Sequence, residues 1–375
     1  MNAREQKFLH AFSSLGVIGS KTLPRLKEEF GSFEQAWNAS NSAFGRIKLS
    51  PNQKEAISQK RSSVQPDRAI QELVRERIWI IDRESEEYPR VLREIPDAPF
   101  LLYAQGERDL FSTLDFHGSS TPQAKNACLA IVGTRKPTAY GLEVTEKITR
   151  ELTDTGITIA SGLASGIDAK AHKAALDNKG KTIAVLGSGI DRKSLFPKEN
   201  IKLADRIVKE GGLIVSEYPP GTPGFKENFP QRNRIISGIS QGVLVIEARE
   251  KSGALITARF ALEQNREVFA IPGSMFSKTA EGPNRLIQEG AKLVMSAKDI
   301  LEEFGIEYEV DSPGKSLSSL NEKEMLLLDV LQEPLGVDSI KIKTKLDTAS
   351  IIATLSMLEL KGIVKNMGGD MYAKI

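Results

Sequence analysis

Between Cys128 and Phe304 the chain repeats one pattern, a short run of consecutive apolar residues followed by a stretch with helical spacing. The apolar runs are LAIVGT, GITIAS, KTIAVLG, GLIVSE, GVLVIEA, EVFAIPG and KLVMS. Runs of this length without alternation are typical of parallel strands buried on both faces, and the stretches between them predict crossover helices. The pattern predicts a doubly wound α/β domain, in which the loops that follow the strands share one edge of the sheet.

The flanking segments show shorter and more mixed patterns. Residues 1–75 alternate short helical stretches with polar turns, and the next segment contains two short apolar strands, IWIID and FLLYA. Gly, Ser, Thr and Pro in 116–126 predict a loop. Near the end of the chain, three helical stretches and a hairpin around Gly368 are typical of a winged-helix module. The predicted domains are a helical SAM-like or helix-hairpin-helix-like domain at 1–75, an extended Rossmann-like domain at 76–306 with its core at 128–304, a linker at 307–320 and a winged-helix-like domain at 321–375.

Composition limits the kind of partner that the chain can bind. The formal net charge of +2 over 375 residues is too small for a polycationic surface, so an anion site would have to be local. The single cysteine, Cys128, has no intrachain partner for a disulfide, which favours a reducing compartment. No run reaches the ~20 apolar residues that span a bilayer, and the first residues lack a secretory pattern. We therefore expect a cytoplasmic protein without a membrane segment.

Known cofactor motifs fail when they are compared residue by residue. The first strand leads into IVGTRKPTAYG instead of GxGxxG, and no acid closes the second strand, which argues against NAD. The GKT at 180–182 precedes its strand, and Ala175 stands where a phosphate loop needs glycine, which argues against ATP. The three histidines lack metal-ligand spacing. We predict no metal, no cofactor and no enzymatic activity, and treat four polar residues as structural: Asp168, His172, Glu217 and Glu247.

Cations and glycines follow several predicted strands, and these positions share one edge of the sheet. Glycine turns and helix N-termini expose backbone N–H groups, and together with cations they suit phosphate groups. An aromatic ring in the segment FKENFPQRNRIISG, 225–238, offers a surface on which a base could stack. The candidate nucleic-acid contacts are Gly133, Thr134, Arg135, Gly162, Lys198, Lys226, Phe229, Arg232, Asn233 and Arg234.

Each of these residues also has a structural alternative. The glycines could serve tight turns, with Asp168 capping the helix that follows. Phe229 could anchor its loop in the core, and Asn233 could cap a short helix that begins after Pro230. The arginines could pair internally with Glu217 or Glu247, because a buried arginine is usually paired.

Two further segments bear on nucleic acids. The segment LGVIGSKTLPRL, 15–26, is similar to the hairpin of helix-hairpin-helix units, in which Gly16 and Gly19 would expose N–H groups to a phosphate; packing of a small helical module is the alternative. The third helical stretch of the C-terminal module, TASIIATLSMLELKG, has one lysine and no arginine. Helices that read base edges normally carry Arg, Asn or Gln, so we do not expect sequence-specific duplex recognition there.

The chain resembles the DNA-processing protein A family, DprA, which is also called Smf. The segments that carry the resemblance follow in family order: IVGTR, SGLASGIDAKAH, GSGID, SEYPPGT, FPQRNRIISG, SGALITARFA, VFAIPG and GPNRLIQEGAKLV. The resemblance implies a cytoplasmic bacterial homodimer that binds single-stranded DNA cooperatively and protects it from nucleases. It also implies that the protein loads the RecA recombinase onto this DNA during natural transformation and homologous recombination.

The resemblance also implies roles for individual residues. Arg135 and Lys198 match family cations on the DNA backbone, and Lys226 with Phe229 matches a lysine and a base-contacting aromatic residue. Arg232 and Arg234 lie in a family motif. Two departures stand out: Thr134 replaces the usual serine, and the segment DRKSLFP, 191–197, is longer than usual and has Phe196 in place of a tyrosine.

Two other functions remain open on the sequence. A phosphoribohydrolase of the lysine-decarboxylase-like type would share a Rossmann-like core, but its PGGxGTxxE motif is replaced here by EKSGALITARFA. A winged-helix transcription regulator would prefer one duplex sequence over single strands.

Overall fold

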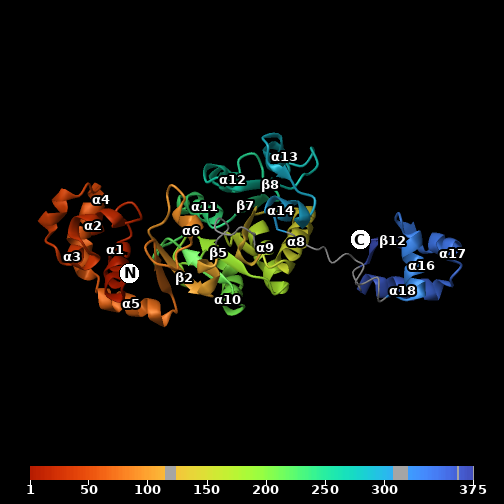
Figure 1. The fold of residues 1–375 in the computed structure, drawn as a ribbon, viewed down its shortest axis with the longest axis horizontal. Helices are drawn as coiled ribbons and strands as arrows, with labels where there is room; N and C mark the ends of the chain where they lie inside the picture. Colours follow the sequence, from red (N-terminus) through yellow and green to blue (C-terminus); the bar gives the residue numbers. More distant parts are fainter. Residues whose placement is uncertain (115–123, 307–319, 361–362, 375) are drawn as a thin grey trace. The chain divides into compact units, whose positions relative to one another are not determined.

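The computed structural model describes residues 1–114, 124–306, 320–360 and 363–374 (Figure 1). The chain forms two compact units, Met1–Glu307 and Tyr308–Ile375. The division falls at the start of the predicted linker, whose residues up to 319 lie outside the described residues, as does most of the predicted loop 116–126. No helix of the described residues is long and apolar enough to cross a membrane.

A nine-stranded sheet organises the first unit, with strand order β1-β2-β6-β5-β4-β3-β7-β8-β9. From β3 to β9 all neighbouring strands are parallel, which confirms the seven predicted strands of the doubly wound domain. The two strands predicted before them extend the sheet beyond β6 in antiparallel pairing. The strands are β1 (Trp79–Asp82), β2 (Leu101–Gly106), β3 (Cys128–Val132), β4 (Thr158–Ser161), β5 (Thr182–Leu186), β6 (Leu213–Ser216), β7 (Gly242–Val245), β8 (Glu267–Ala270) and β9 (Lys292–Leu293).

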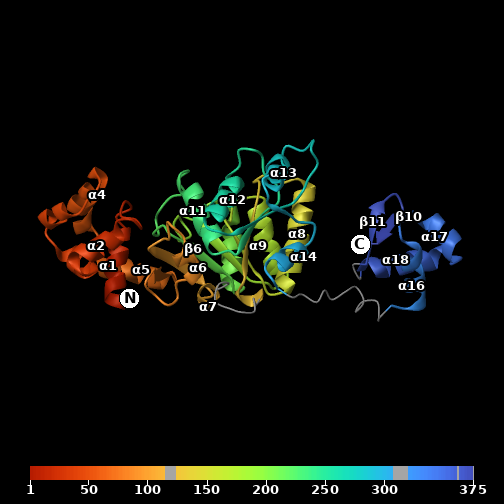
Figure 2. The same ribbon diagram turned by 45° about the horizontal axis from the view of Figure 1, so that its top comes forward.

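Helices cover both faces of the sheet (Figures 1 and 2). Alternate residues of β3 enter opposite cores: Ala130 packs with apolar residues of α11 and α12, and Leu129 packs with those of α8, α9 and α14. This burial on both faces is why the strands appear in the sequence as continuous apolar runs. The helices of this part are α6 (Arg90–Arg93), α7 (Asp109–Ser112), α8 (Ala139–Asp154), α9 (Ile167–Asp177), α10 (Ile201–Lys209), α11 (Asn228–Gly238), α12 (Gly253–Glu263), α13 (Glu281–Gln288) and α14 (Ala297–Glu303).

The N-terminal residues form short helices that share a core with the sheet. Phe12, Leu26 and Phe33 are fully buried and belong to one hydrophobic cluster with Tyr103 of β2 and Ile207 of α10. The helical segment 1–75 is therefore packed against the sheet domain within one compact unit. Its helices are α1 (Ala3–Ser13), α2 (Leu23–Phe30), α3 (Phe33–Asn38), α4 (Pro51–Glu55) and α5 (Pro66–Arg75), with short 3-10 and π turns between them.

Among its described residues, the second unit contains three helices and a small antiparallel sheet of order β10-β12-β11. Its core includes the buried residues Leu327, Ile340, Leu355 and Val364. The three helices and the β11–β12 hairpin agree with the sequence pattern, and the short β10 is an addition to it; assignment to the winged-helix class stays a prediction. The elements are α16 (Glu322–Val330), β10 (Leu335–Gly336), α17 (Val337–Thr344), α18 (Thr348–Leu360), β11 (Val364–Gly368) and β12 (Met371–Lys374).

Candidate nucleic-acid interface

The loops that follow β3, β5 and β6 meet around one aromatic side chain, Phe229, in the first turn of α11. Phe229 is half-buried, and the exposed ring of Phe196 lies 5.6 Å from it between ring centroids. The guanidinium carbon of Arg135, which is also exposed, lies 5.7 Å from the centroid of the Phe229 ring. We call Arg135, Phe196 and Phe229 the Phe229 cluster. It combines one cation with two partly exposed aromatic rings.

Two glycines make room for the Phe229 ring. A Cβ atom at Gly187, directly after β5, would lie 2.7 Å from Cδ1 of Phe229. A Cβ atom at Gly224, in the loop after β6, would lie 3.0 Å from Cζ of the same ring. The Phe229 ring therefore packs on the sheet edge, as expected if it anchors its loop. The rest of the ring is exposed to solvent.

The backbone around Arg135 is held by its neighbours. The N–H of Thr134 donates to the main-chain oxygen of Glu247 at 2.7 Å, and the N–H of Ile167 donates to that of Thr134 at 3.2 Å. Gly166 has φ +82°, and a Cβ atom there would collide with the main chain of Thr134 and Arg135. The loops after β3 and β4 therefore pack directly on each other, and this contact fixes the position from which the Arg135 side chain extends.

Arg232 lies beneath this surface, which corrects the expectation that it faces the crevice. It is 5% exposed, and its Nη1 donates to the main-chain oxygens of Gly162, at 2.9 Å, and of Val185. Burial lowers the pKa of Arg232 to about 10, and the nearby Asp168 carboxylate opposes this shift. The Arg232 guanidinium therefore joins α11 to the ends of β4 and β5.

Asp168 holds the loop after β4 and does not cap α9, whose N-cap residue is Gly166. Its Oδ2 accepts hydrogen bonds from the N–H groups of Gly162 at 3.1 Å and of Ala164 at 3.4 Å. Burial raises the pKa of the Asp168 carboxyl group, and the charge of Arg232 acts against this rise. The structural interpretation of Asp168 is therefore correct, although the predicted cap is wrong.

Asn233 and Arg234 also serve internal contacts. Helix α11 begins at Asn228 with Pro230 in its first turn, so Asn233 lies inside the helix and is not the predicted cap. Its buried side chain donates to the main-chain oxygen of Gly253 at 3.2 Å. Arg234 forms an ion pair with Glu217 at 2.9 Å, and both side chains are largely buried. For Arg234 the alternative of internal pairing with Glu217 is confirmed.

The two lysines of the candidate set are exposed at the same edge. Lys198 lies in the 3-10 helix η5 (Lys198–Asn200), and its Nζ donates to the main-chain oxygen of Lys193. The Asn200 side chain fastens η5 to the loop after β4 through a 2.9 Å hydrogen bond to the oxygen of Leu163. Lys226 lies in the loop that leads into α11. Sequence reasoning missed Phe196 as a member of the site, although its position two residues before Lys198 could have indicated it.

An internal carboxylate fills the position where doubly wound folds bind ligands, the switch point between β3 and β7. Glu247 is 4% exposed and accepts hydrogen bonds from the N–H of Thr138 at 2.9 Å and from its hydroxyl at 2.7 Å. The hydroxyl of Thr279 donates a third bond of 2.9 Å. Because Thr138 is the N-cap of α8, the Glu247 carboxylate occupies the helix N-terminus that would otherwise attract a phosphate.

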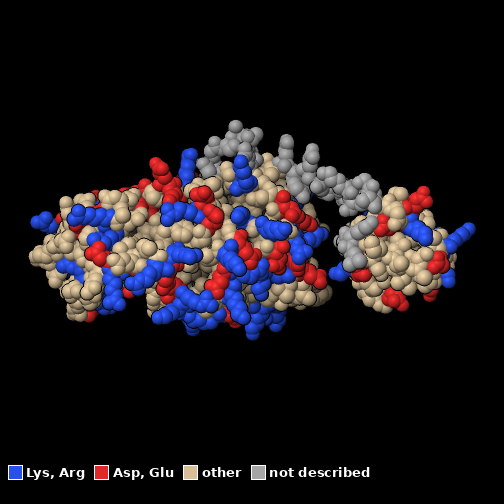
Figure 3. Space-filling view, turned by 90° about the horizontal axis from the view of Figure 1, so that it is seen from below, with Lys and Arg blue, Asp and Glu red and all other residues tan. Residues whose placement is uncertain are grey.

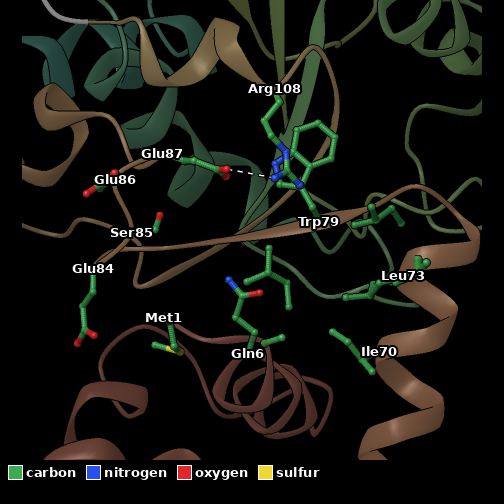
Figure 4. A pocket seen from close by; sticks show the side chains of 14 residues that line it. Met1, Gln6, Ile70, Leu73, Trp79, Glu84, Ser85, Glu86, Glu87 and Arg108 are labelled. Atoms are coloured by element: carbon green, nitrogen blue, oxygen red, sulfur yellow. Dashed lines mark hydrogen bonds and ion pairs between the residues drawn. The ribbon is translucent and has the colours of Figure 1, made fainter.

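Carboxylates also mark a cavity of about 670 Å³ between α5, β1 and the loop after β1 (Figure 4). Glu84, Glu86 and Glu87 line it, and Glu87 pairs with Arg108 at 3.1 Å. The guanidinium of Arg108 lies 5.0 Å from the ring centroid of Trp79. The three carboxylates disfavour a phosphate chain in this cavity. Figure 3 shows Lys and Arg interspersed with Asp and Glu over the face in view. This mixture agrees with an anion-binding site that is confined to one small part of the surface.

Comparison with known proteins shows the relatives of the chain. Residues 79–305 match the family model of DNA recombination-mediator protein A. Protein Smf of Synechocystis is 35% identical over 405 residues, which cover 99% of each chain. The X-ray structure of DNA processing protein A from Streptococcus pneumoniae superposes with a TM-score of 0.65 at 34% identity, covering 81% of this chain and 99% of that chain.

A second solved structure, of DNA processing protein A from Helicobacter pylori, concerns the single-stranded DNA binding mode of that protein. It matches with a TM-score of 0.51 at 29% identity, covering 60% of this chain and 94% of that chain. The Streptococcus match shows the same α/β fold over most of the chain. With a family model that spans most of the sheet domain and a relative aligned from end to end, the chain belongs to the DNA recombination-mediator protein A family, DprA/Smf.

Proposed function

We propose that the protein binds single-stranded DNA without sequence preference at the sheet edge around the Phe229 cluster. The observation that carries the proposal is the exposed Arg135 guanidinium next to the half-buried Phe229 ring, 5.7 Å from its centroid. A phosphate on a cation with a base stacked on a neighbouring ring is the contact that a single strand offers at every nucleotide. The single-stranded DNA binding described for the Helicobacter relative supports this proposal.

In this proposal the candidate residues divide into two groups. Arg135, Lys198 and Lys226 contact phosphates, and Phe229 stacks on a base with Phe196 beside it. Gly133 and Gly162 serve internal packing in place of DNA contact. A Cβ atom at Gly133 would lie 2.6 Å from Cγ1 of Ile167, and one at Gly162 would lie 2.5 Å from Nη2 of Arg232. Thr134 supports the loop that presents Arg135. The remaining candidates hold the loops in position without touching DNA: Arg232, Asn233 and Arg234.

We extend the proposal through the family to homologous recombination. The protein protects the bound strand, loads the RecA recombinase onto it during natural transformation, and acts in the cytoplasm as a homodimer. The free edge of the sheet supports the homodimer, because Leu293 of β9 is 42% exposed and Met295 is 74% exposed. Exposed apolar side chains at a sheet edge favour cover by another chain. Sedimentation of the wild-type protein and of Leu293→Arg tests whether the protein forms a homodimer through this edge.

The proposed activity is binding without catalysis. The phosphoribohydrolase alternative is disfavoured because Glu247, which takes three internal hydrogen bonds, occupies the anion position at α8. Incubation with nucleoside monophosphates and detection of released base would reveal this activity. The regulator alternative is disfavoured because α18 exposes the apolar residues Ile352 and Met357, which suit a protein partner better than a base edge.

The decisive test measures fluorescence anisotropy of labelled oligonucleotides across salt concentrations. Arg135→Ala and Lys198→Ala should each weaken single-strand binding equally on all base sequences and reduce the salt slope by about 0.7. Lys173→Ala, which removes an exposed cation from α9, serves as the matched control. Unchanged affinity in both Arg135→Ala and Lys198→Ala, with folding intact, would exclude this edge as the binding site.

A further inference from the structure

The loop between β8 and α13, residues 271–280, exposes two adjacent apolar side chains at its tip. Phe276 is 92% exposed, the highest value for any large apolar residue that the structure describes, and Met275 is 83% exposed. Scattered apolar residues are common on protein surfaces, but adjacent ones on a fixed loop point to contact with another molecule. We call residues 271–280 the Phe276 loop.

The Phe276 loop is held in one conformation by hydrogen bonds at its base and in its turn. The N–H of Gly273 donates to Oδ1 of Asn284 at 3.1 Å, and Nδ2 of Asn284 donates to the main-chain oxygen of Gly273 at 2.9 Å. The N–H of Ser277 donates to the main-chain oxygen of Ser274 at 2.9 Å. This turn places Met275 and Phe276 at its two central positions, so the fold itself presents the Phe276 ring to solvent.

A second aromatic side chain, Tyr140 in the first turn of α8, is attached to the same loop. Tyr140 is 49% exposed, and its hydroxyl donates to the main-chain oxygen of Pro272 at 2.9 Å. The N–H of Ala248, after β7, donates to the main-chain oxygen of Thr279 at 2.7 Å. The segments that follow β3, β7 and β8 are therefore joined to one another, with an exposed ring on the first and on the last of them.

A pocket of about 410 Å³ opens between Tyr140 and the base of the Phe276 loop. Its lining is mainly apolar and includes Ile246, Ile271 and Ala280, with the Glu247 carboxylate among these residues. The negative charge of Glu247 repels a phosphate, whereas an uncharged base meets apolar walls and an aromatic ring. The pocket therefore favours a base, with its phosphate outside.

The three loops carry cations that have no partner of their own. In the segments 133–138, 246–252 and 271–280 the one exposed carboxylate is Glu250, which pairs with Arg285 at 3.2 Å. Beside the cluster residue Arg135, four further cations of these segments are exposed and form no ion pair with another described residue: Lys136, Arg249, Lys251 and Lys278. The surroundings of the Phe276 loop therefore favour an anionic ligand.

These cations continue the sheet edge that carries the Phe229 cluster. Lys136 directly follows Arg135, and β7 and β8 are the next two strands beyond β3. Neighbouring strands lie about 4.8 Å apart, so β8 lies about 10 Å from β3. Figure 2 shows the loops that lead into α11 and α13 on the same side of the sheet domain. A few nucleotides beyond Arg135 would thus reach the Phe276 loop.

We propose that Tyr140 and Phe276 form a second base-binding position, and that a single strand held at the Phe229 cluster continues across the ends of β3 and β7 to reach it. Bases of the strand stack on the two rings, and its phosphates pair with the four exposed cations. The inference rests on the proposed function, because the strand must first be held at the Phe229 cluster.

A second copy of this chain is the other molecule that could cover Met275 and Phe276. A twofold contact through the Phe276 loop would bring the same surface of both copies together, so that Lys278 and its neighbours would meet cations of equal charge. Like charges in a contact oppose binding, whereas a single strand supplies the missing negative charge. The charges of this surface therefore favour nucleic acid.

The test uses the full chain with two substitutions at Phe276. Phe276→Leu keeps an apolar side chain but removes the ring, and Phe276→Trp keeps a ring and adds a fluorescent reporter. The matched control is Met275→Ala, which removes an exposed apolar side chain from the same turn without changing a ring. Circular dichroism melts check folding. Anisotropy is then measured with single strands of about 4 and about 16 nucleotides, the range of known site sizes.

We expect Phe276→Leu to bind the longer strand about fivefold or more weakly than the wild type, the loss that corresponds to one stacked base. The shorter strand, held at the Phe229 cluster, should bind all variants as it binds the wild type. Phe276→Trp and Met275→Ala should bind the longer strand like the wild type. The longer strand should also quench the tryptophan that Phe276→Trp adds, beyond any change seen for Trp37 and Trp79 in the wild type.

Two results would overturn the inference. One is equal affinity of Phe276→Leu and Met275→Ala for the longer strand, together with an unquenched tryptophan in Phe276→Trp. The other is a changed sedimentation coefficient of Phe276→Leu at unchanged DNA affinity, which would make the loop a contact between copies of the chain.

The two proposals can fail separately. Arg135→Ala, measured in parallel, should weaken binding of both strands if the Phe229 cluster is the primary site. If Arg135→Ala leaves both affinities unchanged, the proposed function fails and the continuous strand fails with it. If Arg135→Ala weakens both while Phe276→Leu matches Met275→Ala, only the second base-binding position is rejected.

Discussion

The Nη1 atom of Arg232 donates a hydrogen bond of 2.9 Å to the main-chain oxygen of Gly162. The same nitrogen also donates to the oxygen of Val185, so one buried cation joins α11 to the ends of two strands. The N–H of Gly162 in turn donates to Asp168 at 3.1 Å. The buried Arg232 guanidinium thus holds the backbone of the loops at the sheet edge from which the exposed cations extend.

Replacement of Arg232 by Met should destabilise the protein and weaken DNA binding together. The substitution leaves two carbonyl oxygens without their donor and removes the cation near Asp168. Hydrogen bonds to charged groups contribute about 1.5–3 kcal/mol, so we expect a fall of about 3 kcal/mol in the free energy of unfolding, measured with urea. Lys173→Met is the exposed control. Full stability with complete loss of DNA binding would instead mean that Arg232 contacts the ligand.

Substitution of Gly187 by Ala should act through the Phe229 ring. The new methyl group would lie 2.7 Å from Cδ1 of Phe229 and push the ring out of its seat. We expect the variant to lose about 1–3 kcal/mol of single-strand binding energy, the range for a stacked base and the loss expected for Phe229→Ala. A double-mutant cycle checks the mechanism, because the two losses should not add. Additive losses would indicate that Gly187 acts independently of the ring.

Acid should destabilise the fold through two buried histidines. Burial lowers the pKa of His10 to about 4 and that of His172 to about 3. Below pH 6.5 these histidines bind protons in the unfolded chain but stay neutral in the folded chain. Their contribution to the free energy of unfolding is therefore complete above pH 6.5 and is lost as the pH decreases toward 4. Each histidine contributes a slope of up to about 1.4 kcal/mol per pH unit, and the raised pKa of Asp168 acts in the opposite direction at the acid end.

Urea unfolding between pH 7 and pH 4 measures this dependence. His172 contacts the Thr182 hydroxyl at 2.7 Å, and that hydroxyl also donates to the oxygen of Ile159, so Nδ1 of His172 carries the proton. His172→Asn can keep a donor toward Thr182 but has no group that titrates in this range. The variant should therefore lose part of the acid slope. An unchanged slope in His172→Asn would show that other groups dominate the acid response.

Removal of the Glu247 carboxylate should create an anion site at the start of α8. Glu247→Ala leaves the N–H and hydroxyl of Thr138 and the hydroxyl of Thr279 without their acceptor, next to a cavity of about 410 Å³. We expect the variant to be less stable by about 1–3 kcal/mol in total, because the exposed Thr138 can bond to water in place of the carboxylate. Added inorganic phosphate should raise the melting temperature of the variant but not that of the wild type. Equal responses to phosphate would contradict this interpretation of the switch point.

The sequence predicts the sheet well because its strands are buried on both faces. β3, β5 and β7 appear as runs of four or five mostly apolar residues, the length and composition of strands buried on both faces. Once the strands are assigned, the right-handed crossovers bring the loops of Arg135 and Phe229 to one edge. The shared edge follows from this topology, but the contact between Arg135 and Phe229 does not, because β4 and β5 lie between β3 and β6.

The sequence could not predict that Arg135 is exposed while Arg232 and Arg234 make internal contacts. For Arg232 this depends on where α11 begins. Pro230 suggests a helix that starts after it, but proline is tolerated in a first turn, and the helix starts at Asn228. With this start, Phe229 and Arg232 both belong to the helix and lie three residues apart on one face. Arg232 is buried, and Phe229 is only half-buried. The pairing of Arg234 with Glu217 depends on contacts distant in the sequence, which no local pattern encodes.

The Glu247 carboxylate has a consequence for control of the protein. Since the Glu247 carboxylate supplies the negative charge at the start of α8, the phosphate of a free nucleotide cannot bind there. Occupation of the proposed DNA site would then not depend on a nucleotide bound at this helix end.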